Sequence, residues 1–368
     1  MRVVRIALLL IPVSGLLNLV LSYLRAARAT TSYAWLVAGE TCGWLAVAAT
    51  LLVLEGDLEL MILGLLTIRS LILAVGVGLV LSRSRIWSPR LSSLGPYLRY
   101  GLPLLPLGVL NWVINASDRF FLSYFCEPEV VGIYAVSYGI GSIVGLAYAP
   151  VFFVLLPATA AAWSGGRSEE VDEYLRFAQK YPFLVAVPVV LLLTGYAEAT
   201  IGLLATKSFA ATPMLIGCVA MAIAIMNVGA IAQTVLNLDG RSGRILLTSV
   251  GTASFNIAAN ALAVPYYGAM GAAVTTLMTY TLQALVTHLL SRSVLPFPWA
   301  WRLMLKALLS ALPLALCLTL SNNAAVPQPL LAIGGCAAYA GLLFASGVFE
   351  PREWRLVLAV INLGKGRP

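Results

Sequence analysis

Long apolar stretches alternate with short polar ones along almost the whole chain. An apolar stretch of about 20 residues is the length at which a helix crosses the hydrocarbon core of a bilayer. Proline and glycine inside such stretches are compatible with spans, because neighbouring helices can satisfy the interrupted backbone. The pattern predicts an all-α integral membrane protein with about eleven transmembrane helices, at 6–24, 33–54, 58–81, 101–125, 130–156, 181–205, 209–237, 245–265, 268–290, 303–321 and 328–348.

Composition supports this prediction and excludes other classes of protein. Of the 368 residues, 60% are hydrophobic and 10% are charged, whereas an ordinary soluble domain is about 25% charged. A soluble enzyme and a disordered chain are therefore excluded. The five cysteines are scattered, without CxxC spacing or a partner histidine, and no metalloprotease, Walker or glycine-rich phosphate motif occurs. We expect no metal and no cofactor.

Basic residues gather in alternate loops. One set of loops holds 18 of the 23 Lys and Arg residues, including Arg83, Arg85, Arg241 and Arg244. Positive loops face the cytoplasm, so we expect a multi-pass membrane protein with a cytoplasmic C-terminus. Eleven spans then place the N-terminus outside, although Arg2 and Arg5 lie there. We therefore interpret the net charge of +8 as a consequence of how the chain is oriented in the membrane, and we expect no nucleic-acid partner.

A weak internal repeat relates two parts of the chain. Arg25-x-x-Arg28 and Arg241-x-x-Arg244 are offset by 216 residues, and LVLSRS (79–84) corresponds to HLLSRS (288–293). Spans one to three therefore match spans seven to nine. Spans four to six have no counterpart after Met1, so we expect roughly 120 further residues, forming three spans, to precede it in a longer gene product.

The predicted span 101–125 carries one polar stripe. Asn111, Asn115, Asp118 and Arg119 fall within an arc of about 100° on a helix with 3.6 residues per turn. Burying a polar side chain at membrane depth costs free energy, so its presence there needs an explanation. Arg119 could bind a phosphate group bidentately. Alternatively, Asp118 and Arg119 could neutralise each other and hold neighbouring helices together.

Two further charged residues lie inside predicted spans. Arg69 falls near the middle of 58–81, and Glu40 falls one to two turns into 33–54. Each is either a residue of a polar cavity or half of a buried ion pair. Asn256 and Asn260 share a helical face, and interhelical hydrogen bonding is the role that we expect for them.

Several segments resemble one family of membrane transporters. They are YLRYGLPLLPLGVLNWVINASDRFFLSYFCEPEVVGIYAVSYGIGS (97–142), the Pro150 to LLPA stretch, the acidic connector 164–180, and FAATPMLIGCVA (209–220). Together they are similar to the C-terminal half of Wzx-type lipid-linked oligosaccharide flippases of the multidrug/oligosaccharidyl-lipid/polysaccharide superfamily. Ser117-Asp118-Arg119-Phe120 followed by Val131-Gly132-Ile133-Tyr134 is the most specific part.

The resemblance implies a two-lobe helical bundle with an incomplete first lobe. A partial N-terminal lobe of three helices would span 1–82, a complete lobe of six helices 97–293, two accessory helices 300–348, and a cytoplasmic interfacial tail 349–368. It also implies a transporter, not an enzyme, that moves polyprenyl-diphosphate-linked oligosaccharide repeat units across the plasma membrane for cell-surface polysaccharide biosynthesis.

The implied partners are the lipid-linked oligosaccharide, membrane lipid and glycan-assembly proteins. Arg119 and Arg69 are the candidates for diphosphate contact, Asn111 and Asn115 for sugar contact, and Glu40 and Asp118 complete the substrate pathway. Three alternatives remain open: a drug or cation antiporter of the same superfamily, a membrane glycan polymerase or ligase, and a truncated remnant that does not transport.

Overall fold

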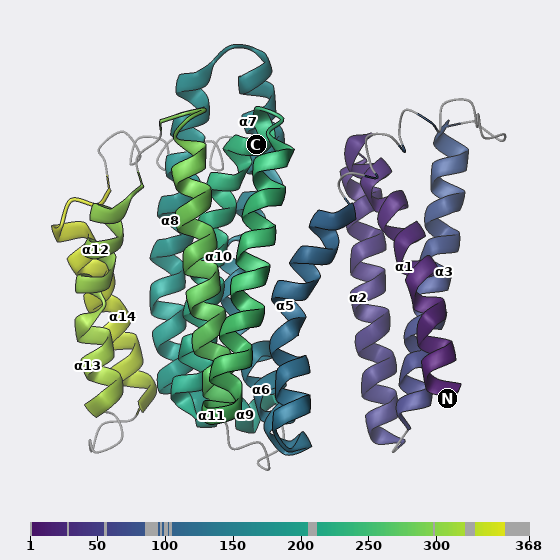
Figure 1. Cartoon of the computed structure of the whole chain (residues 1–368), viewed down its shortest axis with the longest axis horizontal. Coiled ribbons are helices and arrows are strands. Elements are labelled where there is room, and N and C mark those ends of the chain that lie inside the picture. The colour runs from purple at the N-terminus through teal and green to yellow at the C-terminus, as the bar shows by residue number, and fades with distance from the viewer. Residues whose placement is uncertain are drawn as a thin grey trace, which may run out of the picture. The chain divides into compact units, whose positions relative to one another are not determined.

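The computed structural model describes residues 2–27, 29–54, 57–84, 105–204, 212–296, 299–320 and 328–349, with Gly95, Leu98 and Leu102 singly between them. The regular elements among these residues are helices (Figure 1). The chain divides into two compact units, Met1–Leu98 (unit 1) and Arg99–Pro368 (unit 2), and each is described by itself.

Unit 1 is a bundle of three long helices, α1 (Arg2–Ala26), α2 (Thr30–Val53) and α3 (Leu58–Ser84). The buried side chains of its small core come mainly from α1, with Leu24 fully buried, and partly buried side chains of α2 and α3 pack against them. Gly76 on α3 lies so close to Val20 of α1 that an added Cβ would come within 2.7 Å of it. Small residues at such contacts allow helix backbones to approach closely inside a membrane.

Unit 2 begins with α5 (Leu105–Phe125) and a helix interrupted twice, formed by α6 (Pro128–Gly141), the 3₁₀ segment η3 (Ser142–Ala147) and α7 (Ala149–Ser164). Pro150 lies in the first turn of α7, where a missing backbone N–H costs little. The sequence predicted one span at 130–156, and the structure extends the helical path to Ser164. Pro150 at the start of α7 explains the second interruption, between η3 and α7.

The sequence predicts an amphipathic connector (164–180) followed by a span (181–205), and the structure does not separate the two. One continuous helix, α8 (Ser168–Gly195), contains most of both, and α9 (Ala197–Leu204) follows it. Glu169 and Glu170 in the first turn favour a helix start. The turn before α8 contains Gly166 with φ +71°, a conformation that glycine adopts readily.

Helix α10 (Pro213–Leu238) is the central element of unit 2 and packs against α6, α8 and α11. More than half of its span is buried inside the protein. The 50-residue element α11 (Ser242–Ser291) is two helices joined at Gly268, whose φ of 51° and ψ of −132° are not helical. The two halves therefore correspond to the spans predicted at 245–265 and 268–290.

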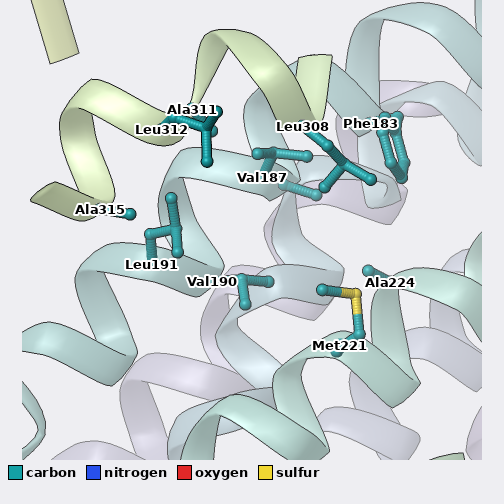
Figure 2. A pocket seen from close by; sticks show the side chains of 11 residues that line it. Phe183, Val187, Val190, Leu191, Met221, Ala224, Leu308, Ala311, Leu312 and Ala315 are labelled. Carbon is teal, nitrogen blue, oxygen red and sulfur yellow. The ribbon is translucent and has the colours of Figure 1, made fainter. Parts of the chain in front are cut away.

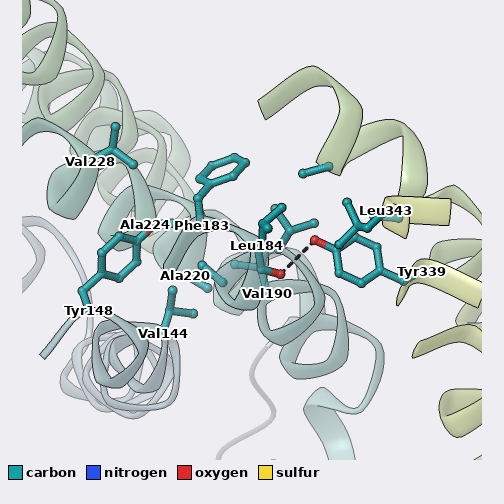
Figure 3. Close-up of a cluster of buried hydrophobic side chains, with 14 of the residues drawn as sticks. Val144, Tyr148, Phe183, Leu184, Val190, Ala220, Ala224, Val228, Tyr339 and Leu343 are labelled. Atoms are coloured by element: carbon teal, nitrogen blue, oxygen red, sulfur yellow. Dashed lines mark hydrogen bonds between the residues drawn. The ribbon is translucent and has the colours of Figure 1, made fainter. Parts of the chain in front are cut away.

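Three C-terminal helices complete unit 2, α12 (Trp301–Ser310), α13 (Leu312–Leu320) and α14 (Gln328–Ala345). Figure 3 shows the largest hydrophobic cluster, in which α14 meets α8, α10 and the η3 region. The Tyr339 hydroxyl of α14 donates a hydrogen bond of 2.8 Å to the backbone carbonyl of Leu184 in α8. This bond satisfies a buried hydroxyl and joins α14 to the bundle.

The helical membrane fold that the sequence predicted is confirmed. Among the described residues, eight helices are long and apolar enough to cross a membrane, and α11 counts once among them despite its break at Gly268. α5, which carries the polar stripe, is not among the eight, and residues 149–164 and 329–345 form shorter apolar helices. Apart from Phe349, the predicted interfacial tail 349–368 lies outside the described residues.

The contact between α10 and α11 gives a first prediction. At Gly229 an added Cβ would lie 2.8 Å from Cβ and 2.9 Å from Cα of Ala284, so the two helices would have to separate. We expect Gly229→Ala to destabilise the purified protein by about 1–3 kcal/mol, the usual cost of overpacking. Thermal unfolding in detergent measures this.

The matched control is Gly251→Ala. Gly251 is an exposed helical glycine of α11 with open space at the Cβ position. An unchanged or raised unfolding temperature is expected there, because alanine favours a helix over glycine. Equal effects of the two substitutions would show that the α10–α11 contact is not tight.

Candidate substrate pathway

In unit 1, one arginine joins all three helices. The Nε atom of Arg69 on α3 lies 2.9 Å from Oε1 of Glu40 on α2, and its Nη1 donates a hydrogen bond of 2.7 Å to Oγ of Ser14 on α1. The structure thus contains the ion pair that was one of two alternatives for these residues. The Arg69 side chain is still 31% exposed, so the ion pair does not enclose its guanidinium group. Ser14 was not foreseen from the sequence.

On α5, the polar stripe divides into a buried part and an accessible part. Asp118 is 1% exposed and accepts hydrogen bonds from the Tyr134 hydroxyl of α6 and from the backbone N–H of Arg119. The carboxylate therefore joins α5 to α6. Its burial removes it from the exposed surface of unit 2.

The guanidinium group of Arg119 lies over an aromatic ring. Its Cζ is 4.8 Å from the ring centroid of Tyr138 on α6, and Nη1 is 3.4 Å from the backbone oxygen of Asn115. The cation–π contact and the hydrogen bond together hold the guanidinium group between α6 and the backbone of α5. Arg119 is half-buried, so this arrangement orients a cation without enclosing it.

Asn111 and Asn115 line a polar cavity of about 180 Å³ between α5, α10 and α11. The Tyr280 hydroxyl donates a hydrogen bond of 2.8 Å to Oδ1 of Asn115, and the Asn115 amide donates one of 2.7 Å to the Asn111 backbone carbonyl. The remaining lining residues that can form hydrogen bonds are Gln233, Gln283 and Thr287. Every lining side chain is uncharged, and apolar residues such as Ile114, Met226 and Ala284 complete the lining, so the cavity offers hydrogen bonds next to apolar surface.

The sequence pointed to the α5 side of this cavity but missed the opposite wall. Tyr280, Gln283 and Thr287 are spaced by three and four residues and so share one face of a helix. The same test for polar stripes that singled out Asn111 and Asn115 would have found them in the predicted span 268–290.

A buried hydrogen-bond network lies beside the stripe. The Ser117 hydroxyl of α5 donates to Oδ1 of Asn256, whose amide donates to Thr279 at 3.0 Å. The Thr275 hydroxyl donates to Oδ1 of Asn260 at 2.7 Å. These bonds join α5 to both halves of α11 and confirm interhelical hydrogen bonding as the role of Asn256 and Asn260.

A second, apolar cavity lies between α8, α10 and the C-terminal helices. Figure 2 shows its side chains, which offer carbon atoms and one methionine sulfur. Its volume is about 150 Å³, and Phe183, Val187 and Val190 of α8 face Met221 of α10 and Leu308, Leu312 and Ala315 of α12 and α13. Such a surface accepts hydrocarbon and excludes charged groups.

Among the described residues, no group of three or more His, Cys, Asp or Glu side chains is placed to hold a metal ion. The five cysteines, Cys42, Cys126, Cys218, Cys317 and Cys336, are free thiols.

The arrangement of helices defines a class of membrane protein. The structure is similar to that of the lipid II flippase MurJ in an inward closed conformation, with a TM-score of 0.70. The similarity covers 91% of this chain and 72% of that protein, at 14% sequence identity. At this identity the comparison establishes the fold, which is the fold that the sequence resemblance implied.

The particular family follows from the sequence itself. Residues 2–214 match the model of the polysaccharide biosynthesis protein family, which is more than half of the chain. The protein belongs to this family. The family match confirms the resemblance to Wzx-type flippases that the sequence indicated. An uncharacterized membrane protein of Methanocaldococcus jannaschii, MJ1068, is 24% identical over 185 residues. That match covers 49% of this chain and 36% of the relative's own length.

The ion pair in unit 1 gives a second prediction. In Glu40→Ala, Arg69 loses its carboxylate partner, and an unpaired charge at membrane depth is more costly than no charge. We expect Glu40→Ala to lower the unfolding temperature more than the double substitution Glu40→Ala with Arg69→Met does. Thermal unfolding of the wild type, both single variants and the double variant measures the coupling between the two residues. Additive effects would show that the pair does not stabilise unit 1.

Proposed function

We propose that this protein translocates a polyprenyl-diphosphate-linked oligosaccharide across the plasma membrane during cell-surface polysaccharide biosynthesis. Membership of the polysaccharide biosynthesis family and the MurJ-like fold support a transporter of a lipid-linked substrate. The substrate has three chemically different parts: a charged diphosphate, an uncharged sugar unit and a hydrocarbon tail. Unit 2 offers a different surface for each of them.

The observation that carries the proposal is the contact between two of these surfaces on α5. Arg119 lies one turn from Asn115, and its guanidinium approaches the Asn115 backbone oxygen at 3.4 Å. The Asn115 side chain in turn lines the uncharged polar cavity with Asn111. A cation next to a neutral hydrogen-bonding cavity matches a diphosphate attached to a sugar.

In this proposal each predicted residue has a role. Arg119 binds the diphosphate, and Asn111 and Asn115 bind sugar hydroxyl groups. Asp118 positions α5 against α6 through Tyr134. Arg69, oriented by Glu40, is the candidate for diphosphate contact on unit 1. The apolar cavity of Figure 2 accepts part of the hydrocarbon tail, and rocking of lobes exposes the head group to either side in turn.

The organisation of the chain follows the same proposal. Residues 1–82 act as part of an N-terminal lobe, 97–293 as a C-terminal lobe and 300–348 as accessory helices. The C-terminus lies in the cytoplasm, as the distribution of basic residues indicates. Glycan-assembly proteins that supply or consume the translocated unit are the proposed partners.

A drug or cation antiporter is the second candidate, and the structure favours it less. Such a transporter needs an accessible carboxylate for a cationic substrate. Asp118 is buried and accepts hydrogen bonds from Tyr134 and Arg119, and the charge of Glu40, which is 23% exposed, is neutralised by Arg69.

The third prediction tests the proposal in vesicles. A labelled polyprenyl-diphosphate oligosaccharide is incorporated into proteoliposomes with the full gene product, and its exposure on the outer leaflet is followed with a membrane-impermeant reagent. We expect Arg119→Glu to slow translocation by about a hundredfold, because it replaces an attraction to the diphosphate by a repulsion. Arg119→Lys retains the charge but loses the planar donor pair, and an intermediate rate is expected.

The matched control is Arg176→Glu. Arg176 is an exposed arginine of α8 in a surface ion pair with Asp172, so its reversal changes the net charge equally. Its translocation rate is expected to equal that of the wild type. Undiminished translocation by Arg119→Glu would contradict the assignment of Arg119. Transport of a cationic drug, but not of the lipid-linked oligosaccharide, would favour the antiporter.

A further inference from the structure

Two arginines converge on one serine where the two ends of α11 meet. Oγ of Ser293 accepts hydrogen bonds from Nη1 of Arg244 at 2.6 Å and from Nη1 of Arg241 at 3.3 Å. The serine hydroxyl donates to the Leu290 backbone carbonyl at 2.8 Å, which fixes its orientation. Because one oxygen accepts both bonds, the two guanidinium groups are held side by side. Neither arginine is used by the proposed transport function.

This cluster carries an excess of positive charge. Asp239 forms an ion pair with Arg241, which leaves the charge of Arg244 without that carboxylate. The Arg241 side chain is 32% exposed, so a ligand can reach it. Guanidinium groups held together repel each other, and an anion between them relieves the repulsion. A phosphate group fits best, since its oxygens accept pairs of guanidinium N–H donors.

The surroundings of the cluster indicate a lipid. Leu247 lies three residues after Arg244 and is 73% exposed, and Leu289 lies four residues before Ser293 and is 63% exposed. Exposed apolar side chains continue from them along both halves of α11, at Val250, Ile257, Leu285, Met278 and Val274. The basic cluster thus forms the end of an apolar surface. A free phosphate ion would use only the cluster, whereas a lipid would use both parts.

We propose that Arg241, Arg244 and Ser293 form a binding site for the phosphate headgroup of an anionic membrane phospholipid, whose acyl chains lie along the exposed face of α11. Headgroups of this kind attract basic residues at the ends of membrane helices. A bound lipid would hold together the start of the first half and the end of the second half of α11. The site shares no residue with the polar cavity and does not depend on the proposed transport function.

The fourth prediction tests this site by native mass spectrometry of the purified full-length protein. The protein is incubated with phosphatidylglycerol or phosphatidylcholine, and the bound lipid is counted. We expect more adducts with phosphatidylglycerol than with phosphatidylcholine. The double substitution Arg241→Gln with Arg244→Gln is expected to lower the phosphatidylglycerol adducts by about tenfold, because it removes both converging charges.

The matched control removes two other arginines. Arg167→Gln with Arg176→Gln takes the same charge from exposed ion pairs of α8, and the phosphatidylglycerol adducts are expected to remain. Arg241→Lys with Arg244→Lys retains the charge but loses the paired guanidinium donors, so an intermediate number of phosphatidylglycerol adducts is expected. Thermal unfolding of each variant is measured alongside.

Three results would overturn the proposal. The first is equal loss of lipid in the Arg241/Arg244 and Arg167/Arg176 variants, which would show a general charge effect. The second is unchanged binding after removal of Arg241 and Arg244. The third is equally strong binding of glycerol phosphate and phosphatidylglycerol, which would show that the acyl chains contribute nothing and that the ligand is a free phosphate compound.

Discussion

A polar side chain at membrane depth needs a partner, because hydrocarbon offers no hydrogen bonds in place of water. In this protein the partners lie on other helices. Arg69 of α3 reaches Glu40 of α2 and Ser14 of α1, and Asp118 of α5 reaches Tyr134 of α6. Hydrophobic burial provides little preference for one arrangement of apolar helices in a bilayer, so these polar contacts specify which helices pair.

Close packing of small residues adds to this constraint. α10 is the most enclosed of the candidate spans, and the contact at Gly229 and Ala284 brings its backbone against the second half of α11. α11 in turn holds α5 through Ser117 and Asn256. Two contacts therefore place Asn111 and Asn115 of α5 opposite Tyr280. One is the apolar contact between α10 and α11, and the other is the polar contact between α5 and α11. The polar cavity is a consequence of the packing of the bundle.

The charged residues divide according to their surroundings. Asp118 is enclosed between helices and acts within the fold, while Arg119, its neighbour in the chain, is half-buried and oriented by an aromatic ring. Mutual neutralisation was one of the two alternatives for these adjacent residues, but in the structure their side chains contact different partners, Tyr134 and Tyr138. The same contrast appears at the end of α11, where Asp239 pairs with Arg241 and Arg244 is directed to Ser293.

The length of the apolar stretches was sufficient to predict most of the helices, because the thickness of the bilayer core sets how many apolar residues a span needs. The polar stripe of α5 was also readable, since residues three and four apart share a helical face. The ends of α8 were not, because its charged first half and apolar second half are one helix despite their different composition. The break at Gly268 agrees with the boundary that the sequence predicted between the spans 245–265 and 268–290.

The sequence by itself therefore determined the class of protein, the positions of its helices, the family and the residues whose polarity needed an explanation. The tertiary structure alone decided their partners. Glu40 and Arg69 are 29 residues apart, Asn115 and Tyr280 are 165 apart, and Arg244 and Ser293 are 49 apart. The physical reason is that helix periodicity places a side chain on a face, whereas its contacts depend on which other face packs against it.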